Sequence, residues 1–158
     1  MNDIDTYYNQ INSNIRKGKY KLLGSGSGRR VYDLGNGYVV KVAKNRKGIA
    51  QNKTEYEISS NDPSDVFARV KAMSDDSIFL VMEKAQRLKD LSYVRQYYHV
   101  YNNRQLFQIN ELRDFYVYND LLVPDLYRCV NWGMIDGKPV IIDYGFTKNV
   151  RRKYYSMF

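Results

Sequence analysis

The sequence contains a single cysteine, Cys129, and a single histidine, His99. One cysteine cannot form an internal disulfide bond, which points to a reducing compartment, and we expect a cytoplasmic protein. Together the two residues cannot supply the four ligands of the usual Cys/His zinc site, so the chain alone does not build one. We assign His99 to a packing or surface position rather than to catalysis, and we propose no nucleophilic role for Cys129.

Long hydrophobic runs are missing as well. No stretch approaches the roughly eighteen apolar residues of a membrane-spanning helix, and residues 1–15 lack the basic start and apolar core of a signal peptide. We therefore expect neither a membrane span nor a secretion signal. Proline is scarce, and its three occurrences fall at predicted boundaries between elements: Pro63, Pro124 and Pro139.

What the chain does have is enough apolar sequence for a core and an excess of positive charge. Of its 158 residues, 44% are apolar and 27% charged, which fits one domain or two small lobes that share a cleft and excludes a disordered chain. Lys and Arg number 25 against 17 Asp and Glu, a net charge of +8. This charge favours anionic partners: nucleotide phosphates, nucleic acid or an acidic protein surface.

The first half of the sequence predicts a helix followed by a sheet of about five strands with one further helix. Asn36 and Gly37 tolerate positive φ angles and would form a tight hairpin turn. The predicted elements are a helix over residues 3–15, strands over 19–23, 30–34 and 38–43, a helix over 49–60, and strands over 65–73 and 77–83.

The second half predicts mostly helix. Residues 88–119 carry an apolar stripe at helical spacing, an irregular stretch at 125–133 follows, and residues 148–158 predict a basic helical tail. A turn at Asp136 and Gly137 precedes a short apolar strand. The whole predicts an α+β fold: an N-terminal helix (1–18), a small antiparallel β-sheet lobe with one helix (19–86), and a truncated, mostly helical C-terminal lobe (87–158).

A glycine-rich segment, residues 23–32, lies between two predicted strands. Glycines there let the backbone fold close to phosphate groups and aim amide N–H groups at them. Gly24, Ser25, Gly26 and Ser27 are therefore candidate phosphate-binding residues. Any glycine-rich hairpin would give the same pattern, so the loop alone does not establish phosphate binding.

Lys41 lies inside an apolar strand, where alternation places it on the same face as Val39 and Ala43. If that face is buried, the ammonium needs an anionic partner, because an unpaired buried charge costs several kcal/mol. If the strand lies at an edge of the sheet, Lys41 would face water instead.

The helix over residues 49–60 offers two partners for this lysine, Glu55 and Glu57. Only one of them can face the sheet squarely. We favour Glu55, because Asn52, Glu55 and Ser59 follow the spacing of a single helix face. A solvated helix surface is the alternative for either glutamate.

Asp143 follows three branched apolar residues and precedes Tyr144 and Gly145. A carboxylate at the end of a buried strand is well placed to hold a divalent metal, although an aspartate at this point could also cap a turn. Upstream, Asp125 and Asn131 flank a loop and could add a base and a second metal ligand. Neither residue alone indicates a function, but the order in which they follow the other candidate residues supports these roles.

That order, from the glycine loop through the strand lysine and helical glutamate to Asp-Tyr-Gly, resembles the protein-kinase-like fold over about residues 19–147. Leu-Gly-Ser-Gly-Ser-Gly-Arg-Arg-Val-Tyr at 23–32 is similar to the kinase phosphate loop L-G-x-G-x-x-G-x-V-Y, with Arg29 where the third glycine usually stands. Asp143-Tyr144-Gly145 resembles the metal-binding D-F-G motif. The resemblance implies ATP and Mg²⁺ as cofactors.

The resemblance also implies roles for individual residues. Lys41 would contact the α- and β-phosphates and pair with Glu55, and Asp125 would be the catalytic base. Asn131 and Asp143 would hold the metal. The remaining nucleotide contacts implied are Val31 above the base and the backbone of a hinge over residues 82–85, through Glu83 and Ala85.

The sequence departs from the kinase pattern in two places. Val123 and Pro124 stand where the catalytic loop usually has His-Arg, and Asn131 follows Asp125 by six positions instead of five. Only thirteen residues follow Gly145, so we expect no activation segment and no helices for a peptide substrate. The short spacing is similar to atypical or small-molecule kinases and to compact kinase-like proteins of phages, which would act in the host cytoplasm.

Three hypotheses follow for function. The first is a minimal ATP-dependent phosphotransferase, because most of the catalysis in this class is positioning and electrostatics. The second is a pseudokinase that acts by docking to a protein partner. The third and weakest is a nucleic-acid binder, based on basic runs at 16–21, 44–48 and 148–153. The sequence leaves open the phosphate acceptor and whether a homodimer completes the missing part.

Overall fold

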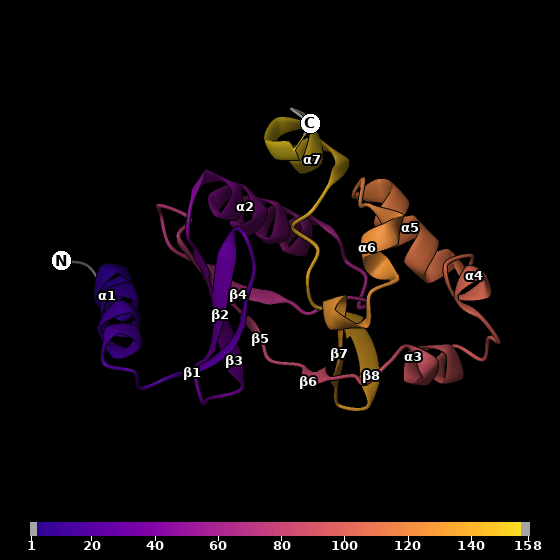
Figure 1. Cartoon of the computed structure of the whole chain (residues 1–158), viewed down its shortest axis with the longest axis horizontal. Helices are drawn as coiled ribbons and strands as arrows, with labels where there is room; N and C mark the ends of the chain where they lie inside the picture. Colours follow the sequence, from indigo (N-terminus) through magenta and orange to yellow (C-terminus); the bar gives the residue numbers. More distant parts are fainter. Residues whose placement is uncertain (1–2, 156–158) are drawn as a thin grey trace.

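An antiparallel sheet forms the N-terminal lobe of the computed structural model, which describes residues 3–155. Its strand order is β1-β2-β3-β5-β4, with every neighbouring pair antiparallel (Figure 1), so the predicted five-stranded sheet is confirmed. Its strands are β1 (Lys21–Ser25), β2 (Arg29–Asp33), β3 (Tyr38–Ala43), β4 (Val70–Met73) and β5 (Phe79–Glu83).

The β2–β3 turn differs from the prediction in one detail. Positive φ angles occur at Gly35 (76°) and Gly37 (89°), not at Asn36. The Asn36 side chain instead accepts a hydrogen bond from the backbone N–H of Tyr38 at 3.2 Å, and the Leu34 N–H donates to the Tyr38 carbonyl at 3.0 Å. The turn is therefore longer than a two-residue hairpin, which explains why both glycines are needed.

Two helices cover opposite faces of this sheet (Figure 1). α1 (Asp3–Arg16) buries Tyr8 and Ile11 against Val40 and Val81, as expected for a brace. α2 (Arg46–Asn61) packs on the other face and buries Gly48, Asn52, Glu55 and Ile58. Because strand residues alternate between faces, Lys41 lies on the α2 side when Val40 faces α1.

α2 begins three residues before the predicted start. The side chain of Asn45 accepts a hydrogen bond from the Gly48 N–H at 3.0 Å, the usual function of an N-cap asparagine. At the other end the Asp62 N–H donates to the Ile58 carbonyl at 2.8 Å, which confirms the predicted stop.

The C-terminal lobe is built from short helices and a small sheet. Residues 88–119 form separate short helices rather than a long one, because His99 adopts a positive φ of 57° and Asn102 caps a new helix. Strand β8 is the short apolar strand predicted after the turn at Asp136 and Gly137, whereas β6, β7 and their pairing with β8 are not predicted by the sequence analysis. The elements are β6 (Gln86–Arg87), α3 (Ser92–Tyr97), α4 (Asn103–Leu106), α5 (Asn110–Tyr118), α6 (Val123–Leu126), η1 (Cys129–Asn131), β7 (Trp132–Ile135), β8 (Lys138–Ile141) and α7 (Lys148–Tyr155).

The two lobes meet along β8. The predicted strand over residues 65–73 is too long, because residues 66–68 leave the sheet and pair with Ile141: the Ile141 N–H donates to Val66 at 2.8 Å and the Ala68 N–H donates to Ile141 at 2.9 Å. Phe67 and Phe115 stack beside this bridge with ring centroids 5.0 Å apart. One buried core therefore spans both lobes.

The C-terminal segment is helical as predicted over α7, and residues 156–158 of the predicted tail lie outside the described part of the chain. Between residues 3 and 155, no helix combines the length and the apolar character needed to cross a membrane.

Substitution of Gly48 by alanine tests the close contact between α2 and the glycine loop. In an open helix this change stabilises by about 1 kcal/mol. Here the added methyl group would collide with the backbone carbonyl of Gly28, so we expect a loss of about 1–3 kcal/mol in the free energy of unfolding, measured by urea denaturation. Gly26→Ala is the control, because nothing lies within 4 Å of its added carbon. Equal effects at the two positions would contradict the contact.

Candidate functional site

The carboxylate of Glu55 lies at the centre of a buried charge cluster. It is completely inaccessible to solvent and accepts hydrogen bonds from Lys41 Nζ at 2.9 and 3.1 Å. Arg29 Nη1 donates to it at 2.6 Å and the backbone N–H of Tyr144 at 2.9 Å. Glu57, on the same helix, is exposed. The pair predicted from the sequence, Lys41 with Glu55, is therefore present in the structure.

Lys41 connects the sheet to the segment that carries Asp143. Its ammonium donates to the backbone carbonyl of Ile142 at 2.6 Å as well as to Glu55. Burial lowers the pKa of Lys41, and the nearby carboxylates, Glu55 foremost, oppose that effect. The ammonium of Lys41 and the carboxylate of Asp143 thus lie on the same side of the molecule, at the junction of the lobes.

Arg29 is a member of the site that the sequence analysis did not select. Its guanidinium is only 7% exposed and bridges two carboxylates: Nη1 and Nη2 bind Glu55, and Nη2 also donates to Asp143 Oδ1 at 3.1 Å. Nη1 makes a further hydrogen bond to Asn52 Oδ1 at 3.1 Å. The register of β2 and β3, with Val31 opposite Lys41, places Arg29 on the same face as the lysine and could have identified it.

The charges in this cluster shift one another's pKa values. Burial alone would raise the pKa of Glu55, but the positive charges of Arg29 and Lys41 outweigh burial and hold the pKa at about 2. Burial alone would lower the pKa of Arg29, and the charges of Glu55 and Asp143 raise it instead. Glu55 and Arg29 therefore keep their charges at neutral pH.

Asp125, Asn131 and Asp143 come together on the C-terminal side of the cluster. Asn131 Nδ2 donates to the backbone carbonyl of Asp125 at 2.8 Å, and the Asn131 carbonyl accepts from the N–H of Ile142 at 2.8 Å. Burial raises the pKa of Asp125, and the charge of Asp143 raises it further. The extra residue between Asp125 and Asn131 is accommodated by α6 and the short helix η1.

The glycine loop is held against the start of α2. Lys44 Nζ donates to the Ser25 hydroxyl at 2.7 Å and to the Gly26 carbonyl at 2.5 Å, and Asn45 Nδ2 donates to the Ser27 carbonyl at 2.9 Å. Lys47 also contacts the Ser27 hydroxyl. Gly24 and Ser25 belong to β1, so the free turn is short, at residues 26–28.

Two of the predicted adenine contacts, Val31 and Ala85, are apolar side chains. Both are half-buried and pack against the core that spans the two lobes. Glu83 lies at the end of β5, where its side chain accepts from the Arg69 N–H at 2.8 Å.

The donor set around Asp143 fits a hard divalent cation in part. Its side chain is 45% exposed and therefore reachable, and Asn131, with Nδ2 engaged as a donor, has its amide oxygen left as a ligand. Across residues 3–155, no three His, Cys, Asp or Glu side chains gather into a metal site. Asp143 and Asn131 would thus need oxygens from a phosphate or water to complete the coordination shell.

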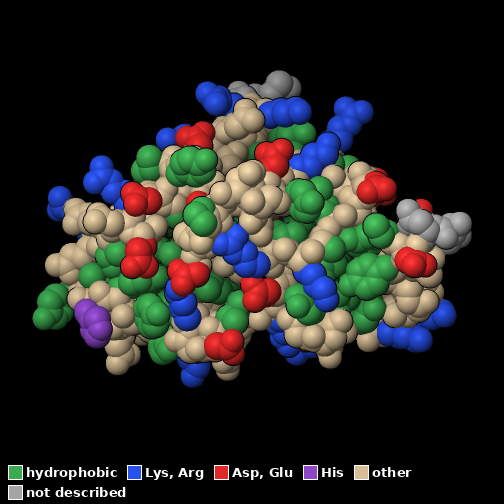
Figure 2. All heavy atoms as spheres, turned by 180° about the vertical axis from the view of Figure 1, so that it is seen from behind, with side chains coloured by type: hydrophobic (Ala, Val, Ile, Leu, Met, Phe, Trp, Pro, Cys, Tyr) green, Lys and Arg blue, Asp and Glu red, His purple; other side chains and the backbone are tan. Residues whose placement is uncertain are grey.

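On the face shown in Figure 2, Lys and Arg side chains are interspersed with Asp and Glu. Lys44 and Lys47 of the run 44–48 are used to hold the glycine loop, as described above. These observations give no support to the nucleic-acid hypothesis.

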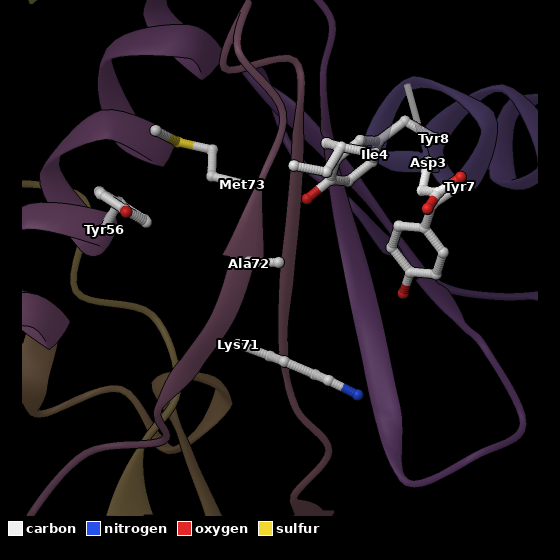
Figure 3. A pocket seen from close by; sticks show the side chains of 8 residues that line it. All are labelled: Asp3, Ile4, Tyr7, Tyr8, Tyr56, Lys71, Ala72 and Met73. Atoms are coloured by element: carbon white, nitrogen blue, oxygen red, sulfur yellow. The ribbon is translucent and has the colours of Figure 1, made fainter. Parts of the chain in front are cut away.

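Two cavities lie away from the charge cluster. One, of about 440 Å³, lies between α1, α2 and β4 (Figure 3). The other, of about 520 Å³, lies between the end of α2 and α5 and includes Asp62, Asp65, Glu111 and Asp114 in its lining. Neither is lined by Lys41, Glu55 or Asp143.

No protein-family profile and no curated protein matches the sequence. Solved structures share its arrangement. The streptomycin–ATP ternary complex of APH(2'')-IIa is similar with a TM-score of 0.48 at 15% identity, over 92% of this chain and 71% of that one. The ADP-bound aminoglycoside phosphotransferase APH(2'')-Ib gives 0.47 at 15%, over 87% and 69%. The PknI kinase domain of Mycobacterium tuberculosis gives 0.46 at 14%, over 82% and 60%.

At identities of 14–15% and TM-scores below 0.5, these similarities carry no inference about substrate or activity. The predicted α+β fold, a small antiparallel sheet with one helix followed by a mostly helical part, is confirmed by the chain's own elements. The five-stranded sheet with α2 precedes a largely helical lobe, and Lys41 and Glu55 meet beside Asp143 at their junction.

Replacement of Glu55 by alanine should be among the most destabilising substitutions in the chain. It leaves the buried charges of Lys41 and Arg29 and the N–H of Tyr144 without their main acceptor, which costs about 3–5 kcal/mol for a buried ion pair. Glu57→Ala, on the exposed side of the same helix, should change the free energy of unfolding by less than about 0.5 kcal/mol. Urea denaturation of both variants measures the difference, and comparable losses would contradict the assignment.

The stability that Glu55 contributes should disappear in acid. Its pKa is about 2 in the folded protein against 4.5 for an ordinary glutamate, so the contribution is complete above about pH 5 and lost as the pH falls from 4.5 toward 2. The shift corresponds to about 3 kcal/mol. We expect the gap in unfolding free energy between wild type and Glu55→Gln to narrow over this range, in denaturation curves from pH 2 to 7. A gap that does not vary with pH would refute the assigned cause.

Proposed function

We propose that the chain is a minimal ATP-dependent phosphotransferase that binds ATP between its two lobes. The observation that carries the proposal is the convergence of Lys41, Glu55 and Asp143, which come from a strand, a helix and a loop far apart in the sequence. A buried lysine fixed by a buried glutamate is a preorganised cation, and such a cation binds phosphate oxygens without first being ordered.

The nucleotide would lie along the junction of the lobes. Lys41 would bind the α- and β-phosphates, while backbone N–H groups of Gly24, Ser25, Gly26 and Ser27 would lie over the phosphates. The base would fit between the apolar side chains of both lobes, Val31 and Ala85 among them, with the backbone of Glu83 and Ala85 facing its edge.

The transfer of the phosphate would depend on three residues: Asp125, Asn131 and Asp143. The raised pKa of Asp125, caused by burial and by the charge of Asp143, suits a group that accepts a hydroxyl proton near neutral pH. Asp143 and Asn131 would hold Mg²⁺, which when bound would offset the charge of the phosphates. The hydroxyl to be phosphorylated, on a protein partner or on a small molecule, would bind beside Asp125.

One observation favours a second candidate function, a pseudokinase that binds nucleotide or a protein partner without turnover. Asp143, the proposed metal ligand, already accepts a hydrogen bond from Arg29 at 3.1 Å. If that contact persists when nucleotide binds, the metal is poorly held and phosphoryl transfer fails, while binding through Lys41 remains.

Ligand-induced thermal shifts test nucleotide binding. ATP with Mg²⁺ at a hundred times its Kd should stabilise the wild type by about 2.7 kcal/mol and raise its Tm. Lys41→Ala should lose this shift and Asp143→Ala should weaken it, whereas Lys53→Ala, an exposed lysine of α2, should keep it. A wild type whose Tm does not respond to ATP would contradict the proposal.

Turnover distinguishes the two candidate functions. Phosphate transfer to water, to the chain itself or to an added acceptor is measured as ADP release with Mg²⁺ or Mn²⁺. For a phosphotransferase, Asp125→Asn should bind ATP as the wild type does and lose about 10²–10⁴-fold in rate. Binding by the wild type without ADP release would favour the pseudokinase.

A further inference from the structure

Arg29 binds Asp143, the carboxylate proposed above as a metal ligand. Its guanidinium is buried at the end of β2 and joins the fully buried Glu55 to the half-exposed Asp143. In the loop pattern that this segment resembles, a glycine stands at this position, and glycine could not reach either carboxylate. The contact is therefore a property of this chain.

Arg29 is not the only partner of Glu55. Glu55 also has an ion pair with Lys41 and a hydrogen bond from the Tyr144 N–H. Arg29 adds a second positive charge, so that two cations, Arg29 and Lys41, face two anions, Glu55 and Asp143. The four groups are balanced without a metal, which removes most of the field that would attract one.

A metal ion at Asp143 and the guanidinium exclude each other on electrostatic grounds. Arg29 Nη2 lies 3.1 Å from Asp143 Oδ1, so a doubly charged ion on the same carboxylate would lie within a few ångströms of a fixed positive charge. Arg29 cannot relieve the repulsion by losing its proton, because the pKa of an arginine in contact with carboxylates stays high. For a metal to bind at Asp143, the guanidinium must therefore move away, and otherwise the metal binds weakly.

We propose that Arg29 sets the metal requirement of the site: its guanidinium and a divalent cation compete for Asp143, and Arg29 supplies the positive charge there when no metal is bound. The inference deepens the proposed function and rests on it in taking Asp143 as the metal ligand. We expect polyphosphate to bind to the metal-free protein as well, because Arg29 and Lys41 place two positive charges beside Asp143.

Direct titration with Mn²⁺ tests the competition in the absence of nucleotide. Electron paramagnetic resonance gives the free Mn²⁺, and we expect Arg29→Gln to bind the ion on the order of tenfold more tightly than the wild type. Arg30→Gln, the exposed neighbour on β2, should match the wild type. Addition of Asp143→Asn to Arg29→Gln should abolish the gain. Equal Mn²⁺ affinities in wild type and Arg29→Gln, or a gain that survives Asp143→Asn, would overturn the inference.

Arg29→Lys separates charge from packing. Lysine keeps the positive charge, so its Mn²⁺ affinity should stay within about threefold of the wild type even if the fold is loosened. If Arg29→Gln does not fold, as judged by circular dichroism, the comparison of wild type, Arg29→Lys and Asp143→Asn still decides. In that case, tight Mn²⁺ binding by the wild type that is lost in Asp143→Asn would overturn the inference, because the guanidinium would then not keep the ion from this carboxylate.

Calorimetry of ATP binding, with Mg²⁺ or with EDTA, completes the test. The wild type should keep its ATP affinity within about tenfold when Mg²⁺ is removed, while Arg29→Gln should depend strongly on the metal. Loss of wild-type binding in EDTA would contradict the inference. Absence of ATP binding in every condition would contradict the proposed function instead. The Mn²⁺ titration would still test whether Arg29 and the metal compete for Asp143.

Discussion

The buried carboxylate of Glu55 is the constraint on which the rest of the site depends. It accepts from β3 through Lys41, from β2 through Arg29 and from the Asp143–Gly145 segment through the Tyr144 N–H. A buried carboxylate is tolerated only when such donors surround it. The need to satisfy the carboxylate therefore also fixes the position of each donor. One side chain of α2 thereby sets the position of two strands and a distant loop.

The surroundings of this carboxylate are organised to keep α2 in place. Asn45 caps the helix, and Gly28 and Gly48 let the glycine loop and the helix approach without side chains between them. Tyr144 supplies its N–H to Glu55 and its hydroxyl to the Ala68 carbonyl at 2.6 Å, while its ring lies 5.0 Å from that of Phe67. The hydroxyl explains a tyrosine here rather than a phenylalanine: it satisfies a backbone carbonyl within the core.

Much of the site follows from short-range patterns. Alternation along β3 predicted that Lys41 lies on an inner face, and the helical spacing of Asn52 and Glu55 favoured Glu55 over Glu57 as its partner. Both predictions succeed because the geometry of strand and helix sets these periodicities. Arg29 was missed because it was compared with a glycine position. Strands β6 and β7 and the breaks between residues 88 and 119 were missed for another reason: short elements carry too little periodicity to be recognised.

By itself the sequence determined the five-stranded sheet with its two helices, the glycine loop, and the pairing of Lys41 with Glu55. Each depends on residues close together in the chain or on a repeating pattern. Only the tertiary structure decided that Arg29 bridges Glu55 and Asp143, and that residues 66–68 pair with Ile141. These contacts join segments up to 114 residues apart, and no local preference of the chain encodes which distant partner a buried charge or a free backbone group will find.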